Sequence, residues 1–356
     1  AGIPVILGGL HVSLSPNEAK KHADAICVGE GESVWPEIVA DLLENRLQPV
    51  YNARKRPFDL GNSAIPAFEL LTGDRYPRFT IQTQRGCPLS CEFCAASMRI
   101  SPQFKVKPVE NVIAELRRLK ELFGNPFIEF ADDNTFANRA HSVRLLRALA
   151  KENVRWFTES DLRIAEDEEL LRLMRNAGCQ QVLIGFESPR YSALDGIEQR
   201  SNWKARQVDR YLRAVERIQR HGITVNACFV LGIDGTGPES FDEVFRFVRE
   251  SGLSDVQITY LTPFPGTPLF ARLSEEGRIL AEAATERCTL FDINFQPDQM
   301  SVNELETGFR ELTGRLYAPE FVEERHQRFR YHLRQRIREE RNVVSKKREI
   351  LTKKLK

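Results

Sequence analysis

From residue 79 to residue 264, the chain alternates nearly continuous apolar runs with longer segments whose apolar residues recur every three or four positions. Runs of the first kind are typical of buried strands, and the spacing of the second kind is typical of amphipathic helices. The apolar stripe of the first helical segment begins at Val109 and ends at Phe123, between Pro108 and Gly124. Proline suits a helix start and glycine a helix end. Six runs are predicted to be strands: 79–84, 127–132, 154–159, 181–187, 225–233 and 256–264.

Strands that alternate with helices predict right-handed β-α-β units and therefore a parallel sheet. Six units are fewer than the eight of a closed barrel, so we expect an α/β fold with a partial (β/α)6 parallel barrel. Residues 1–70 show the same alternation on a smaller scale, with predicted strands at 3–7 and 24–28 and a helix at 17–22. This part is predicted to be a fragment of a Rossmann-like α/β domain with a linker. The barrel is expected over residues 71–275, and a mostly helical extension over 276–356.

Polar residues recur where the predicted strands end. Because the carboxyl ends of parallel strands meet at one edge of a sheet, these side chains are expected to form a functional site. Some could instead cap the helix that follows, which is the alternative for Asp133, Asn134 and Ser188. A carboxylate at the mouth of a buried strand needs a partner, which favours a binding role for Glu159 and Glu187. The strand-end residues are Arg85, Asp132, Asp133, Asn134, Glu159, Arg163, Glu187 and Ser188.

The stretch RGCPLSCEFC, residues 85–94, crowds three cysteines, Cys87, Cys91 and Cys94, into eight positions. Three thiolates can each bind one iron of a [4Fe–4S] cluster and leave the fourth iron open, as a catalytic metal site requires. Structural zinc is the alternative, but it prefers four ligands, and no second CxxC or His pair stands within the next several dozen residues. The spacing therefore favours a cluster. The other cysteines, 27, 179, 228 and 288, are dispersed among apolar residues and are predicted to be buried thiols.

Charge adds one feature to this picture. The chain has a net charge of +1, yet residues 320–356 carry 13 Lys and Arg against 6 Asp and Glu. This basic helical tail fits a contact with RNA or with an anionic membrane surface. The alternative, which we favour, is a solvated helix supported by its own Glu–Arg pairs. No run of 18 apolar residues and no export leader is present, and an odd count of seven cysteines argues for reduced thiols. We expect a cytoplasmic protein. The opening AGIPVILGG, without Met, suggests a fragment of a longer chain.

The cysteine stretch CPLSCEFC resembles the CxxxCxxC signature of the radical S-adenosylmethionine (radical SAM) superfamily, and the six β-α units resemble its partial barrel. The resemblance implies that Cys87, Cys91 and Cys94 bind a [4Fe–4S] cluster whose open iron holds S-adenosylmethionine. It also implies that Phe93 contacts the adenine. In this superfamily, one-electron reduction of bound S-adenosylmethionine yields a 5′-deoxyadenosyl radical, while the protein orients the cofactors and excludes water.

The resemblance also gives roles to the strand-end residues. Asp132 or Asp133 would accept hydrogen bonds from the ammonium group of S-adenosylmethionine. The usual GGE run is replaced by ADDN, so the choice between the two acids stays open. Residues that would hold the ribose hydroxyls or the carboxylate end are Glu159, Arg163, Glu187 and Ser188.

The phrases VILGGLH, ADAICVGEGES, IPAF and PFPGTPLF resemble the superfamily branch in which a cobalamin-binding domain precedes the barrel. In that branch Gly8 and Gly9 would lie against the nucleotide tail of cobalamin. The earlier DxHxxG and SxL signatures of that domain are absent from this chain. The branch implies methylation or rearrangement of a small molecule or lipid, with electrons from a donor such as flavodoxin or ferredoxin. Two alternatives stay open: a radical SAM enzyme that modifies RNA, and a non-catalytic iron–sulfur protein for electron transfer.

Overall fold

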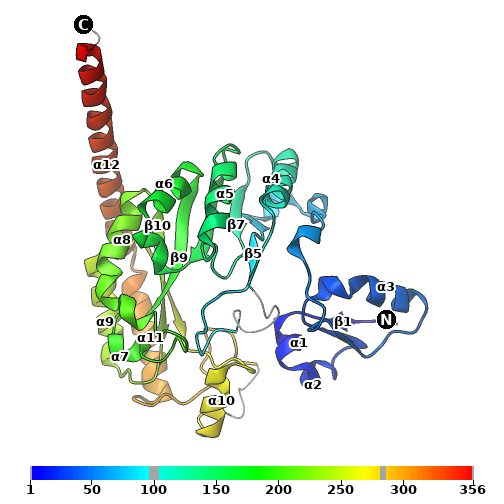
Figure 1. Cartoon of the computed structure of the whole chain (residues 1–356). Helices are drawn as coiled ribbons and strands as arrows, with labels where there is room; N and C mark the ends of the chain where they lie inside the picture. The colour runs from blue at the N-terminus through cyan, green and yellow to red at the C-terminus, as the bar shows by residue number, and fades with distance from the viewer. Residues whose placement is uncertain (1, 96–103, 281–285, 355–356) are drawn as a thin grey trace.

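A six-stranded parallel sheet forms the centre of the molecule (Figure 1). The computed structural model describes residues 2–95, 104–280 and 286–354. The strands follow the order β11-β10-β9-β8-β7-β4, which is their order along the chain except that the separate hairpin β5–β6 comes between β4 and β7. This order confirms the predicted partial barrel. The strand bounds are β4 Phe79–Ile81, β7 Phe127–Phe130, β8 Arg155–Ser160, β9 Cys179–Glu187, β10 Thr224–Leu231 and β11 Asp255–Tyr260.

Helices cover the convex side of this sheet (Figure 1). Strand β10 illustrates the two faces, because its residues alternate between half-buried and buried along the whole strand. Val225 and Phe229 belong to the main core, whereas Asn226 and Cys228 lie on the opposite, half-buried face. The concave face of β10 therefore includes polar and small side chains. The helix bounds are α4 Val109–Phe123, α5 Arg139–Leu149, α6 Glu168–Asn176, α7 Tyr191–Leu194, α8 Tyr211–Arg220 and α9 Glu239–Ser251.

The first predicted strand, 79–84, is interrupted in the structure. Strand β4 ends at Ile81 because the buried Asp132 carboxylate accepts the N–H groups of Thr83 and Gln84, at 2.8 and 3.0 Å. The chain then turns into a separate antiparallel hairpin, in which β5 (Gln84–Arg85) pairs with β6 (Lys105–Val106). A side chain 49 residues away thus decides where this strand stops.

The N-terminal unit, here residues 2–53, has a parallel sheet of its own in the order β1-β2-β3. This unit has two small hydrophobic cores, one around Ile38 and one around Ile26, and both are separate from the core of the barrel. The predicted α/β character is confirmed, although α1, α3 and β3 were not predicted. Its elements are β1 Ile6–Leu7, α1 Leu10–Leu14, α2 Pro16–Ala19, β2 Ala25–Val28, α3 Trp35–Leu43 and β3 Val50–Asn52.

The C-terminal part is helical, as predicted, with α10 (Pro268–Glu275), α11 (Val302–Leu316) and α12 (Pro319–Lys354). Helix α11 packs on the barrel through Phe309, whose ring lies 4.2 Å from that of Tyr260. Helix α12 projects away from the body (Figure 1). None of the helices in the described parts of the chain combines the length and apolarity needed to cross a membrane.

Candidate functional site

The cysteine segment, residues 86–95, leaves β5 at the edge of the sheet where the parallel strands end. Cys91 is buried, and Cys87 and Cys94 are half-buried. The backbone of Cys91 forms an antiparallel bridge with Glu198, and the Glu92 N–H donates to the Ile197 carbonyl at 2.9 Å. These contacts fix the segment against the chain that follows α7.

An ion-pair network anchors the same segment from the other side. Arg272 of α10 contacts Glu92 at 3.0 Å and Asp234, just beyond β10, at 2.7 Å. Arg278 contacts Asp234 at 2.6 Å. The residue between the second and third cysteines is therefore tied to two other elements of the barrel, and the segment is held in place without help from the thiols.

The three thiols interact electrostatically with one another. Burial raises the pKa of Cys91 to about 12, although the Lys204 ammonium lowers it. Burial also raises the pKa of Cys87, while hydrogen bonds from the Leu89 N–H and the Asn134 amide lower it. Asn134 Nδ2 lies 3.9 Å from Cys87 Sγ and donates to Asp161 at 2.7 Å. Without metal, the Cys87 and Cys91 thiols resist ionisation, so positive charge from bound iron would be needed to form their thiolates.

Three thiols in one segment are a donor set that suits an iron–sulfur cluster, whereas structural zinc prefers four ligands. Within the described ranges, no three His, Cys, Asp or Glu side chains converge closely enough for one metal ion. A cluster takes one thiolate per iron and therefore needs thiolates that are near one another but spread apart. Buried oxygens without a hydrogen-bond partner also lie beside the segment, at Gln84 Oε1 and Asn134 Oδ1. They are acceptors available to the donor groups of a bound molecule.

Two neighbouring acids predicted for the site have different surroundings. Asp132 is 3% exposed and accepts hydrogen bonds from Thr83, Gln84 and Thr135. Burial raises the pKa of Asp132 to about 6, although these hydrogen bonds lower it. Asp133 is exposed, and partial desolvation by the surrounding protein raises its pKa, while the Gly86 N–H lowers it. Of these two acids, only Asp133 has a carboxylate that a ligand could reach.

Helix capping does not explain the ADDN residues. Helix α5 begins after Asn138, whose side chain accepts the His141 N–H at 3.1 Å. Neither Asp133 nor Asn134 is the N-cap. Ser188 does make a local bond, since its hydroxyl accepts the Arg190 N–H at 3.1 Å. This is a turn contact before α7, whose N-cap is Arg190, so capping does not explain Ser188 either.

Glu159 is exposed and lies among other acids. Its desolvation, together with the charges of Asp133, Glu129 and Asp132, raises the pKa of Glu159 to about 7. The carboxyl group is therefore poised between its charged and neutral forms near pH 7.

Glu187 is 6% exposed and forms an ion pair with Lys204, which also donates to the Gly185 carbonyl at 3.3 Å. Its backbone φ of +61° is strained for a residue with a side chain. Lys204 was not predicted from the sequence. The pair joins positions 17 apart across irregular structure, and no periodic pattern marks such a contact.

Phe93 lies within the cysteine segment, and Arg163 interacts with Cys87 of that segment. The Arg163 guanidinium pairs with Asp161 and lies 5.2 Å from the centre of the Trp203 ring. The hydrogen bond with Asp161 raises the pKa of Arg163, despite desolvation, and Cys87 contributes to the increase. Phe93 is half-buried and packs against the main core.

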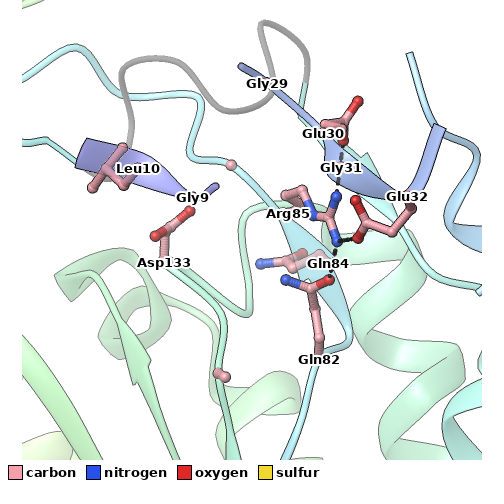
Figure 2. A pocket seen from close by; sticks show the side chains of 12 residues that line it. Gly9, Leu10, Gly29, Glu30, Gly31, Glu32, Gln82, Gln84, Arg85 and Asp133 are labelled. Carbon is pink, nitrogen blue, oxygen red and sulfur yellow. Dashed lines mark hydrogen bonds and ion pairs between the residues drawn. The ribbon is translucent and has the colours of Figure 1, made fainter. Parts of the chain in front are cut away.

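A cavity of about 450 Å³ lies between the N-terminal unit and the barrel (Figure 2). One wall carries Gly9, whose φ of +96° favours glycine, and the facing wall carries Asp133 and Gly86. Gly8 directly precedes this wall and is exposed. The structure thus brings Gly9 to the barrel edge that carries Cys87. The cavity is lined by Gly9, Leu10, Gly29, Glu30, Gly31, Glu32, Gln82, Gln84, Arg85, Gly86, Ala131 and Asp133.

Comparisons with known proteins agree with this geometry. The radical SAM superfamily profile matches residues 81–248, and a domain of unknown function, DUF4070, matches residues 267–355. The chain is 26% identical to bacteriochlorophyllide d C-12(1)-methyltransferase of Chlorobaculum tepidum, over 91% of this chain and 71% of that protein. It is 30% identical to hopanoid C-2 methylase of Rhodopseudomonas palustris, over 91% of this chain and 61% of that protein.

Among solved structures, the chain resembles TsrM, a radical S-adenosylmethionine methyltransferase from Kitasatospora setae with cobalamin and a [4Fe–4S] cluster bound. The TM-score is 0.67 at 16% identity, covering 89% of this chain and 72% of TsrM. This likeness supports the fold. The cysteine motif, the partial barrel and the matched profile together show that residues 81–248 of this chain form a radical SAM domain.

Proposed function

We propose that this chain is the core of a cobalamin-dependent radical SAM methyltransferase that acts on a small molecule or lipid. The observation that carries the proposal is the position of the cavity. Its barrel wall ends at Gly86, one residue before Cys87, and its other wall carries Gly9 and Gly29. Cobalamin bound beside Gly9 and S-adenosylmethionine bound at the cysteine segment would then be neighbours. The chain spans 59% to 71% of the length of the first four curated relatives, so the activity of the whole protein is part of the proposal.

In this proposal Cys87, Cys91 and Cys94 hold three irons of a [4Fe–4S] cluster. When bound, the cluster and S-adenosylmethionine supply reductive cleavage that yields a 5′-deoxyadenosyl radical. The Glu92–Arg272 pair keeps the cysteine segment in position. The Asn134 amide near Cys87 donates toward sulfur and would stabilise its thiolate.

Residues at the strand ends would orient S-adenosylmethionine. Asp133 is the better acceptor for the ammonium group, because the Asp132 carboxylate is already occupied by protein donors. Glu187, held by Lys204, is suited to ribose hydroxyls. Glu159 would add an acceptor on the same edge.

The remaining site roles stay predictions of the same proposal. Phe93 would contact the adenine and Arg163 the carboxylate end, with Ser188 at the ribose. Gly8 and Gly9 would face the nucleotide tail of cobalamin. Two of the curated relatives are named as methylases of bacteriochlorophyllide d and of hopanoids. Their names support a tetrapyrrole-like or lipid substrate over RNA.

The partners and location of the protein also stay predictions. A flavodoxin or ferredoxin would deliver the electron, and the protein would be cytoplasmic. The basic tail, now helix α12, is expected to be solvated rather than bound to RNA or membrane. The domain boundaries after residues 70 and 275 also stay predictions.

The test is S-adenosylmethionine cleavage by the anaerobically reconstituted chain with dithionite, followed by mass spectrometry. Wild type is expected to form 5′-deoxyadenosine and Cys91→Ala is expected to form none. Cys179→Ala is the matched control, because Cys179 is a buried thiol of the core outside the cysteine segment. Equal product from wild type and Cys91→Ala would refute the proposal, and so would a stable cluster that never cleaves S-adenosylmethionine. The second result would instead favour the electron-transfer alternative.

A further inference from the structure

Glu30, in the loop after β2, is a buried carboxylate of the N-terminal unit and is 2% exposed. Its two oxygens contact cations of the barrel, Arg85 Nη1 at 3.0 Å and Lys105 Nζ at 2.5 Å. The Phe58 N–H donates to the same carboxylate at 3.0 Å. Figure 2 shows the Glu30 side chain directed at Arg85 across the cavity wall. The carboxylate therefore has three donors from two separate regions of the chain.

The two cations stand at the two ends of the chain segment that carries the cysteines. Arg85 lies in β5 and Lys105 lies directly opposite it in β6. The chain leaves β5 one residue before Gly86, carries all three cysteines, and returns through β6. A carboxylate that holds both cations therefore holds both ends of that segment together.

The hairpin needs such an anchor. Each of its strands has two residues, and an isolated two-stranded hairpin is marginally stable at best. The side chains of Arg85 and Lys105 are 17% and 14% exposed, so their ion pairs are less weakened by solvent than surface pairs. Glu32 adds a contact with Arg85 at 2.6 Å. The GEGE stretch of the N-terminal unit is thus the acidic side of a contact whose basic side is the hairpin.

From this arrangement we infer that Glu30 is a positioning residue for the iron–sulfur segment. It fixes hairpin β5–β6 to the N-terminal unit, and so sets Cys87 at a defined place beside the cavity. The inference rests on the proposed function, because it takes the cysteine segment as the cluster site. It gives the N-terminal unit a second role, in addition to lining the cavity.

The test compares Glu30→Gln, Lys105→Met and the double variant in the full chain. The matched control is Glu37→Gln, which removes an exposed ion pair between the N-terminal unit and Arg56, at 2.5 Å. The first readout is hydrogen exchange of the amides of β5 and β6 in the protein without iron. The second is the rate at which the reconstituted cluster loses iron to a chelator.

We expect exchange in β5 and β6 to be at least about tenfold faster in both single variants, with no increase in the double variant beyond that of Glu30→Gln, because Glu30→Gln already removes the ion pair of Lys105. Exchange in β8 and β9 should stay within about twofold of wild type in every variant. Iron loss should accelerate in Glu30→Gln and Lys105→Met but not in Glu37→Gln.

Unchanged exchange at the hairpin, or equally faster exchange in β8 and β9, would overturn the inference, since the second result marks a general loss of stability. Unchanged iron loss from the single variants would overturn it as well. If wild type takes up no cluster, the proposed function and this inference fail together. If the hairpin result fails while wild type binds a cluster and cleaves S-adenosylmethionine, only the positioning role is lost.

Discussion

Neutralising Glu187 should lower the free energy of unfolding, because it leaves the buried Lys204 without its counter-charge. In Glu187→Gln, Lys204 loses its counter-charge and keeps neutral acceptors, including the Gly185 carbonyl at 3.3 Å. The Lys204 side chain is 12% exposed, so little water can replace the carboxylate. Burial lowers the pKa of Lys204, but the Glu187 carboxylate, together with Cys91 and Tyr211, raises it more, and the net shift is upward. The substitution removes that compensation.

The expected loss of stability follows from these contacts. Removing one partner of a buried ion pair costs about 3–5 kcal/mol. The Gln amide oxygen still accepts a hydrogen bond, so we expect about 3 kcal/mol at pH 7. The loss of stability cannot exceed the free energy of deprotonating Lys204 in the folded variant. For an unfolded pKa of about 10.4, that limit is about 4.6 kcal/mol at pH 7 and about 1.9 kcal/mol at pH 9. In the variant, folded Lys204 binds its proton less tightly than unfolded Lys204, so stability relative to wild type should rise with pH.

The assay is urea unfolding of the iron-free chain in a Trp35→Phe background. Trp35 is 56% exposed on α3, so its removal leaves Trp156 and Trp203 to report on the barrel. The control Glu37→Gln should change the free energy of unfolding by less than about 0.5 kcal/mol, because its pair is exposed. Combining Glu187→Gln with Lys204→Met should recover most of the loss. A loss below about 1 kcal/mol at pH 7, or one that is unchanged at pH 9, would refute this reasoning.

Further substitutions address the neighbouring residues. Asp133→Asn should weaken S-adenosylmethionine binding by at least about tenfold in equilibrium dialysis, by loss of a charge-assisted bond of about 1.5–3 kcal/mol. Asp132→Asn should instead lower the free energy of unfolding by about 2–3 kcal/mol in urea titration, because it disturbs a buried carboxylate bonded to backbone N–H groups. Wild type should lose about 1 kcal/mol of stability relative to Glu159→Gln between pH 5 and pH 8. The reason is that the raised pKa of Glu159, about 7, makes its ionisation unfavourable in the folded state. Gly185→Ala should cost about 1–3 kcal/mol in urea unfolding, because its Cβ would lie 2.3 Å from Glu187 Oε1. Unaltered S-adenosylmethionine binding by Asp133→Asn would contradict the role of Asp133. Unaltered stability in Asp132→Asn, Glu159→Gln or Gly185→Ala would contradict the role given to that residue.

The barrel could be predicted from the sequence because its signals are local and repeated. Each strand is an apolar run, and helix ends are marked by residues such as Gly124 and Gly252, both of which adopt positive φ. The cysteine motif is equally local, since its three residues lie within eight positions. Local signals of this kind do not depend on knowing which distant residues meet.

The surroundings of the site depend on distant contacts and were harder to predict. The end of β4 is set by Asp132, and the partner of Glu187 is Lys204, in a segment without periodicity. Sequence reasoning treated Asp132 and Asp133 alike, because neighbouring acids look equivalent until the donors around each are known. Similarly, the link between Glu30 and Lys105 spans 75 residues and two structural units.

The most direct test of the central claim is electron paramagnetic resonance of the reduced, reconstituted chain with and without S-adenosylmethionine. We predict about four irons per chain and a [4Fe–4S]⁺ signal that shifts when S-adenosylmethionine is added, because one iron lacks a protein thiolate. A chain that retains zinc instead of iron, or a cluster signal unaffected by S-adenosylmethionine, would contradict the claim.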